Sequence, residues 1–186
     1  MSLVLFMRAV NVAGHQVFRP SLLAKELAHL GVINLGAAGT FVVQGPVSQK
    51  ALRTEVLRRL PVPAEMMILP GRDVASLVTR DPFPSGKAYQ DLPRFVSVMA
   101  KRPSKRPPLP LAEPAGDRWQ VKVVRVSARF ALSFYRRLGP SSVDINGLVE
   151  RRLGVRATTR SWNTISKIHD ILEGGRAASR RVSSTE

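Results

Sequence analysis

The chain has 186 residues, of which 44% are hydrophobic, and it has no cysteine. A chain of this length can bury enough apolar surface to fold as one domain or two small subdomains, and the lack of cysteine excludes disulfides, thiolate metal sites and a cysteine nucleophile. The formal net charge of +16 favours polyanionic partners such as nucleic acid or phosphorylated ligands, although arginine enrichment from a GC-rich genome explains the same excess without a binding role.

The first 70 residues alternate short apolar runs with segments of helical periodicity. In chain order the expected elements are a strand at 2–8, a helix at 21–30, strands at 32–35 and 40–44, a helix after Ser48 and a strand at 65–69. Each helix has one apolar stripe, which must lie on the sheet. The sequence therefore predicts an α+β fold in which residues 1–70 form a ferredoxin-like βαββαβ N-terminal unit.

The two helices of this unit have recognisable ends. Ser21 is the expected N-cap of the first helix and Gly31 its stop, while Ser48 is the expected N-cap of the second helix. The apolar stripes are expected to be Leu23, Leu27 and Leu30 in the first helix and Leu52, Val56, Leu57 and Leu60 in the second.

Residues 71–173 are expected to form a second, less regular α+β half. Its expected elements are a helix at 71–79, a strand at 95–100, a β-hairpin of 118–126 with 129–137, and two C-terminal helices at 143–153 and 161–172. The segment KRPSKRPPLPLAEPAG at 101–116 has five prolines and four basic residues. It is expected to be a loop, because proline donates no hydrogen bond to a sheet ladder. Residues 174–186 lack core-forming periodicity and are expected to be a disordered tail.

The predicted hairpin alternates apolar and polar residues. Phe130, Leu132 and Phe134 are expected to point inward from its second strand. The apolar face of its first strand is expected to hold Trp119, Val121 and Val123. The outward side chains of the second strand are expected to be Arg129, Ser133, Tyr135 and Arg137. The sequence therefore predicts a sheet with a basic outer face.

The first candidate site is ATTRSWNT at 157–164. Ser161 is the expected N-cap of the last helix, and Trp162 lies on the apolar stripe of that helix. The polar residues expected around this helix N-terminus are Thr158, Thr159, Arg160, Asn163 and Thr164. Free N–H groups and the helix dipole favour an anion there. Two interpretations stay open: Arg160 binds a phosphate or carboxylate, or the cluster only caps the helix.

The second candidate site is RAVNVAG at 8–14, which follows the first strand. Arg8 and Asn11 provide hydrogen-bond donors in a loop that ends at Gly14, and such loops often carry sites because a rigid scaffold positions them. The segment is neither a P-loop nor a dinucleotide-binding fingerprint. The glycine-rich stretch 36–45 either lets the backbone approach a ligand or forms a hairpin, and the hairpin is the preferred interpretation.

Catalytic, metal-binding and membrane signals are weak. No Ser-His-Asp set stands in a recognisable motif, so no catalytic residue is assigned. His15, His29 and His169 lack metal-ligand spacing, and neither a metal nor a cofactor is expected. No apolar run is long enough to cross a bilayer, so we expect no membrane insertion and a cytoplasmic location.

Three stretches resemble one family, the domain of unknown function numbered 1697. They are RAVNVAG at 8–14, LGVINLGAAGTFVV at 30–43 and LGVRATTRSWNTISKI at 153–168. Where the family has Ser-Gly-Asn, this chain has Ala38, Gly39 and Thr40. The resemblance implies an α+β protein with ferredoxin-like halves and assigns no activity. The positions that match the family motifs are Arg8, Asn11, Thr159, Arg160, Trp162, Asn163 and Thr164.

Three functions stay open at this point. The first is binding of a phosphate-bearing ligand or nucleic acid by a basic surface. The second is a small metal-independent enzyme for a phosphorylated or nucleotide-like substrate, and the third is a structural or partner-binding module. For a shared ligand pocket, we expect the loop 8–14 and the start of the last helix to meet in space, because both hold polar residues outside the core.

Overall fold

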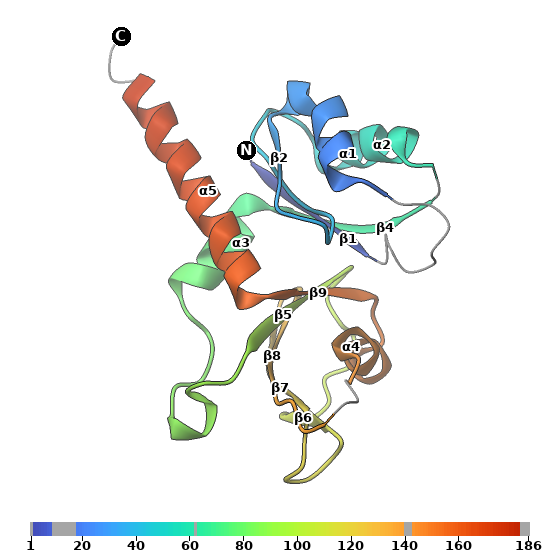
Figure 1. Ribbon diagram of the computed structural model, residues 1–186, viewed down its shortest axis with the longest axis vertical. Helices are drawn as coiled ribbons and strands as arrows, with labels where there is room; N and C mark the ends of the chain where they lie inside the picture. Colours follow the sequence, from blue (N-terminus) through green and yellow to red (C-terminus); the bar gives the residue numbers. More distant parts are fainter. Residues whose placement is uncertain (1, 9–17, 62, 140–142, 183–186) are drawn as a thin grey trace. The chain divides into compact units, whose positions relative to one another are not determined.

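The computed structural model describes residues 2–8, 18–61, 63–139 and 143–182, without the side chains of 176–182 (Figure 1). Within these ranges the protein is mixed α+β, with two antiparallel sheets and five α-helices. It divides into two compact units, namely residues 1–80 with 166–186 and residues 81–165. No helix in the described ranges is long and apolar enough to span a membrane.

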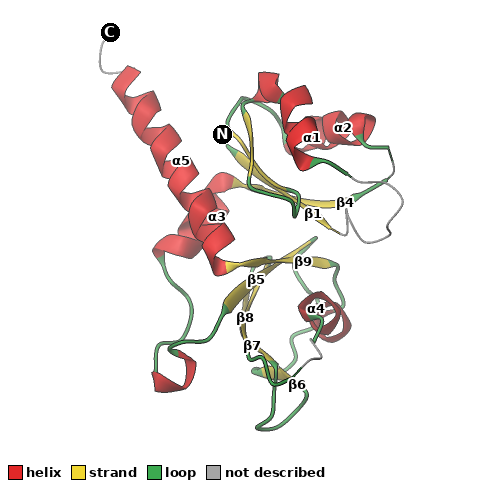
Figure 2. Ribbon diagram, viewed as in Figure 1, coloured by secondary structure: helices red, strands yellow, loops and turns green. Residues whose placement is uncertain are grey.

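The first unit is built on a four-stranded sheet (Figure 2). Its elements are β1 (Leu3–Arg8), α1 (Pro20–Glu26), the short 3-10 helix η1 (Ala28–Leu30), β2 (Val32–Asn34), β3 (Thr40–Val43), α2 (Gln49–Arg59), β4 (Glu65–Pro70) and α3 (Gly71–Thr79). The order of strands and α-helices through β4 is the predicted βαββαβ. The sheet order is β2-β3-β1-β4, and each neighbouring pair is antiparallel.

Helices α1 and α2 cover one face of this sheet (Figure 1). Leu5, Phe41 and Ile68 point from the three longer strands into a core that also takes Leu23 from α1 and Leu52 from α2. Burying each such side chain contributes about 1.5–3 kcal/mol. The apolar stripes of the two helices therefore hold them on the sheet.

Three details of these helices differ from the prediction. Helix α1 ends at Glu26, and Gly31 ends the separate 3-10 helix η1 instead. Arg19, not Ser21, is the N-cap of α1, because Pro20 occupies the first turn, where its fixed φ suits the helix start. Leu57 is exposed rather than part of the α2 stripe. The predicted N-cap of α2 is confirmed, since Ser48 Oγ accepts a hydrogen bond from the Ala51 N–H at 3.1 Å.

Helix α5 (Trp162–Val182) begins in the second unit and belongs to the first from Ser166 onward. Within the first unit its Leu172 packs so closely on Gly71 that a Cβ built on Gly71 would lie 2.9 Å from Leu172 Cδ2. The prediction that this helix ends at Leu172 and gives way to a tail at 174 is wrong, because the helix continues to Val182.

The second unit is built on a five-stranded antiparallel sheet of order β6-β7-β8-β5-β9. Its elements are the 3-10 helix η2 (Lys87–Tyr89), β5 (Arg94–Met99), β6 (Leu111–Glu113), β7 (Val121–Ser127), β8 (Phe130–Tyr135), α4 (Ile145–Leu153) and β9 (Ala157–Ser161). The predicted hairpin is β7 with β8. The two edge strands, β6 and β9, were not predicted.

Both faces of β8 are covered, so the predicted basic outer face is wrong at two of its positions. The register pairs Ser133 with Val123 and Tyr135 with Val121, and paired residues share one face of a sheet. This face packs on α4, and Ser133 is 0% exposed. On the opposite face the Phe134 ring stacks on Tyr89, with 4.5 Å between the ring centroids.

Candidate anion-binding pocket

The first candidate site lies mainly on a strand. Thr158, Thr159 and Arg160 belong to the edge strand β9, which leads directly into the start of α5, and their binding of an anion at this helix N-terminus stays a prediction. Their alternation of small polar residues gave no apolar pattern from which a strand could be recognised. The predicted cap is present, because Ser161 Oγ accepts a hydrogen bond from the Thr164 N–H at 3.4 Å.

Arg160 is a buried cation, with only 8% of its surface exposed. Its Nη1 donates to Thr158 Oγ1 at 2.8 Å and to the Thr159 carbonyl at 2.9 Å. Burial lowers the pKa of Arg160 to about 10, so the side chain stays protonated at neutral pH. Its ligand-binding role stays a prediction.

Thr159 points to the other face of β9 and takes part in a row of polar groups that are buried or half-buried. Ser97 Oγ and Thr159 Oγ1 are 2.7 Å apart, and Thr159 Oγ1 donates to Asn146 Oδ1 at 2.7 Å. Since a hydroxyl has one proton, Ser97 must donate to Thr159. Ser133 Oγ, buried on the same face, has no hydrogen-bond partner among the described residues.

The remaining residues of the first candidate site differ in environment. Trp162 is half-buried and meets the Phe83 ring edge-on, with 5.1 Å between centroids. This contact is in line with the predicted place of Trp162 on the apolar stripe of the last helix. Asn163 is exposed at the start of α5.

The second candidate site is only partly described. Arg8 lies at the end of β1 and pairs across the sheet with Glu65 on β4, with 3.1 Å between Nη1 and Oε2. This ion pair neutralises a cation that was expected to bind a ligand. Asn11 and Gly14 lie outside the described residues. A shared pocket of this loop with Arg160 stays a prediction, because Arg8 and Arg160 belong to different units.

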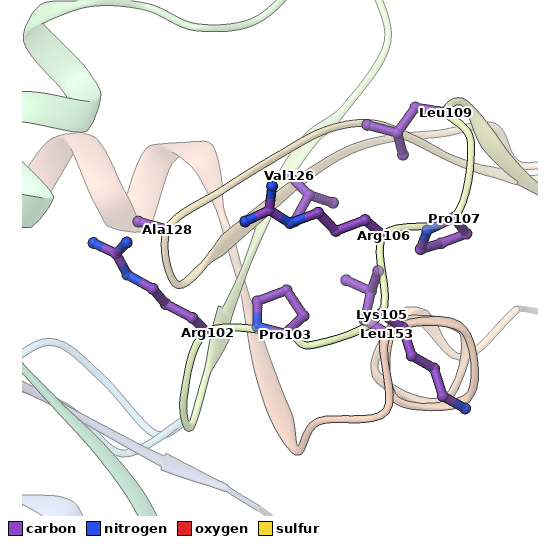
Figure 3. Close-up of a pocket in the computed structure, with 9 residues that line it drawn as sticks. All are labelled: Arg102, Pro103, Lys105, Arg106, Pro107, Leu109, Val126, Ala128 and Leu153. Atoms are coloured by element: carbon purple, nitrogen blue, oxygen red, sulfur yellow. The ribbon is translucent and has the colours of Figure 1, made fainter.

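A pocket of about 360 Å³ lies in the second unit, against the Pro-rich segment (Figure 3). The segment contributes three basic residues and three apolar ones, and the β7–β8 turn and α4 close the rest. The lining residues are Arg102, Pro103, Lys105, Arg106, Pro107, Leu109, Val126, Ala128 and Leu153. Basic and apolar groups thus share one hollow.

The three basic side chains of this pocket are exposed and make no ion pair with any residue that the structure describes. Figure 3 shows Arg102 and Arg106 reaching from the loop toward the β7–β8 turn, whereas the Lys105 ammonium points away past α4. Proline fixes φ, so Pro103 and Pro107 limit the backbone freedom of the loop that carries the two guanidinium groups. The pocket is therefore suited to hold an anion.

The sequence analysis did not identify this pocket, although it noted the unusual composition of 101–116. The available signal was KRPSKR at 101–106, with four cations and no acid in six residues. What the sequence did not predict is β6, whose pairing with β7 folds the loop back beside the hairpin.

Within the described residues, no group of three or more His, Asp or Glu is placed to hold a metal ion. No family model, curated protein or solved structure matches the chain.

Proposed function

We propose that the protein binds nucleic acid, and that the basic pocket of the second unit is the centre of the contact surface. The carrying observation is that Arg102, Lys105 and Arg106 line one hollow and have no ion-pair partner among the described residues. Unpaired guanidinium groups bind phosphate oxygens in bidentate fashion. The +16 net charge of the chain adds long-range attraction for a polyanion.

The proposal is tested by binding of a fluorescently labelled oligonucleotide, followed by anisotropy at about 50 mM salt, where phosphate contacts dominate affinity. Arg106→Gln should weaken binding by about tenfold or more, in line with the roughly 1.5–3 kcal/mol that a hydrogen bond to a charged group contributes. Arg137→Gln is the matched control: it removes the same charge from an exposed residue that follows β8, at the other end of the hairpin from the β7–β8 turn. Equal loss in both variants would argue against a site at the pocket.

We also propose a fold type, a family and a cellular location for the protein. The sheet order β2-β3-β1-β4 with two helices on one face supports a ferredoxin-like unit over Leu3–Pro70. Membership of the family of domain of unknown function 1697 is supported by the three quoted stretches of sequence. A cytoplasmic location follows from the proposed ligand, because nucleic acid is an intracellular polymer.

A further inference from the structure

The apolar residues that line the basic pocket indicate which kind of anionic ligand it binds. Besides its three basic residues, the pocket is lined by Leu109, Val126 and two prolines, with the nearly fully buried Leu153 at its base. Leu109 is 42% exposed, so an apolar surface is open to solvent within the hollow. A phosphate group alone gains nothing from such a wall, because its oxygens need hydrogen-bond donors. The ligand should therefore have an apolar face beside its phosphate.

A nucleotide has both parts, since its base is a flat ring system and its phosphate is an anion. Ligand pockets of a few hundred Å³ are of the size that takes one such group. Arginine also stacks on base planes, so Arg102 and Arg106 can contact either part. The hollow thus matches one nucleotide unit with its base inserted.

We infer that the pocket takes an unstacked base, and that the nucleic acid bound under the proposed function is single-stranded. In a duplex each base is stacked and paired, and moving it out costs a few kcal/mol. A single strand turns its bases outward at much lower cost. A duplex carries the phosphates of two strands and therefore the higher charge density, so a preference for the single strand must come from contact of its bases with the apolar wall.

The experiment compares three labelled probes of equal strand length by anisotropy: a single strand, its duplex, and a single strand in which the central nucleotides are abasic. The intact single strand should bind about tenfold more tightly than the abasic one, a difference that burial of one base face accounts for. The duplex should bind more weakly than the intact single strand. An abasic or duplex probe that binds as tightly as the intact strand would overturn the inference.

Two variants connect this preference to the pocket. Leu109→Ala should lower affinity for the intact strand several-fold and leave the abasic strand unchanged, while Leu138→Ala changes neither. Leu138 is the matched control because it is similarly exposed, at 47%, and does not line the pocket. A loss on both probes in Leu109→Ala, with an unchanged thermal midpoint, would contradict base insertion. If no probe binds at about 50 mM salt, the proposed function fails, whereas equal binding of all probes removes only the inference.

Discussion

The aliphatic stem of Lys105 lies against Gly154, the residue that ends helix α4. A Cβ built on Gly154 would be 3.5 Å from both Cδ and Cε of Lys105. Gly154 has a left-handed backbone with φ of 66°, and the C-terminus of a helix carries the negative end of its dipole. The Lys105 side chain is therefore placed beside the negative end of α4, whereas Arg102 and Arg106 reach toward the β7–β8 turn and are the cations best placed for a ligand.

This relationship predicts different roles for neighbouring cations. Lys105→Gln should lower stability by about 0.3–1 kcal/mol through loss of the helix-end interaction, and it should weaken oligonucleotide binding less than Arg106→Gln does. Urea unfolding gives the first quantity and anisotropy the second. The assignment is wrong if Lys105→Gln weakens binding as much as the arginine variant and leaves stability unchanged.

Two glycines should respond in opposite directions to alanine. Gly71→Ala places a methyl group 2.9 Å from Leu172 Cδ2 and 3.2 Å from the Ser2 carbonyl oxygen, so it should destabilise the protein by about 1 kcal/mol or more. Gly174 lies within α5, and apart from the helix's own backbone no group that the structure describes comes within 4 Å of its Cβ position. Gly174→Ala should therefore stabilise the protein by about 0.5–1 kcal/mol. Thermal unfolding of both variants measures the difference, and a destabilising Gly174→Ala would argue against the observed length of α5.

The row of polar groups on the second sheet predicts a second pair of opposite effects on stability. Thr159→Val removes the hydroxyl that accepts a hydrogen bond from Ser97 and donates one to Asn146. It should destabilise the protein by about 1–3 kcal/mol. Ser133→Ala removes a buried hydroxyl that has no described partner, so it should leave stability unchanged or raise it by up to about 1 kcal/mol. Chemical denaturation distinguishes the two, and a large loss in Ser133→Ala would reveal a partner for that hydroxyl.

Glu55 should make stability depend on acid. The hydrogen bond from Arg59 lowers the pKa of Glu55 below its ordinary value of 4.5, against an opposing effect of desolvation. Because the folded pKa is the lower one, the contribution of this pair is complete above pH 4.5 and is lost as the pH falls through the folded value. Glu55→Gln should thus lower the thermal midpoint at pH 7, and this shift should shrink at the lowest pH at which the protein stays folded, because the wild-type carboxylate takes up its proton as the pH falls. An equal shift at both pH values would contradict this assignment.

Prediction from sequence succeeded where apolar residues repeat with a clear period. Strands such as β1 and β4 and helix α3 follow directly from such patterns. The strand β9 has small polar residues on one face and Arg160 on the other, so its pairing with β5 depends on tertiary structure. The strand β6 is hidden among prolines, which an edge strand tolerates.

In the candidate sites, too, features set by neighbouring residues could be predicted, whereas features set by tertiary contacts could not. Capping of α5 by Ser161 is local chemistry and could be predicted. Burial of Arg160 and the Arg8–Glu65 pair depend on strand register, which the sequence did not specify. The basic pocket requires the loop, the β7–β8 turn and α4 to come together, and no single stretch of sequence encodes that arrangement.

The central claim is that Arg102 and Arg106 contact phosphates of a bound nucleic acid, and its most direct test is the salt dependence of binding. Each phosphate contact to a single strand adds about 0.7 to the slope of log affinity against log salt. For a single-stranded probe, the double variant Arg102→Gln/Arg106→Gln should therefore have a slope shallower than that of the wild type by about 1.4. A double variant with the wild-type slope would contradict the claim.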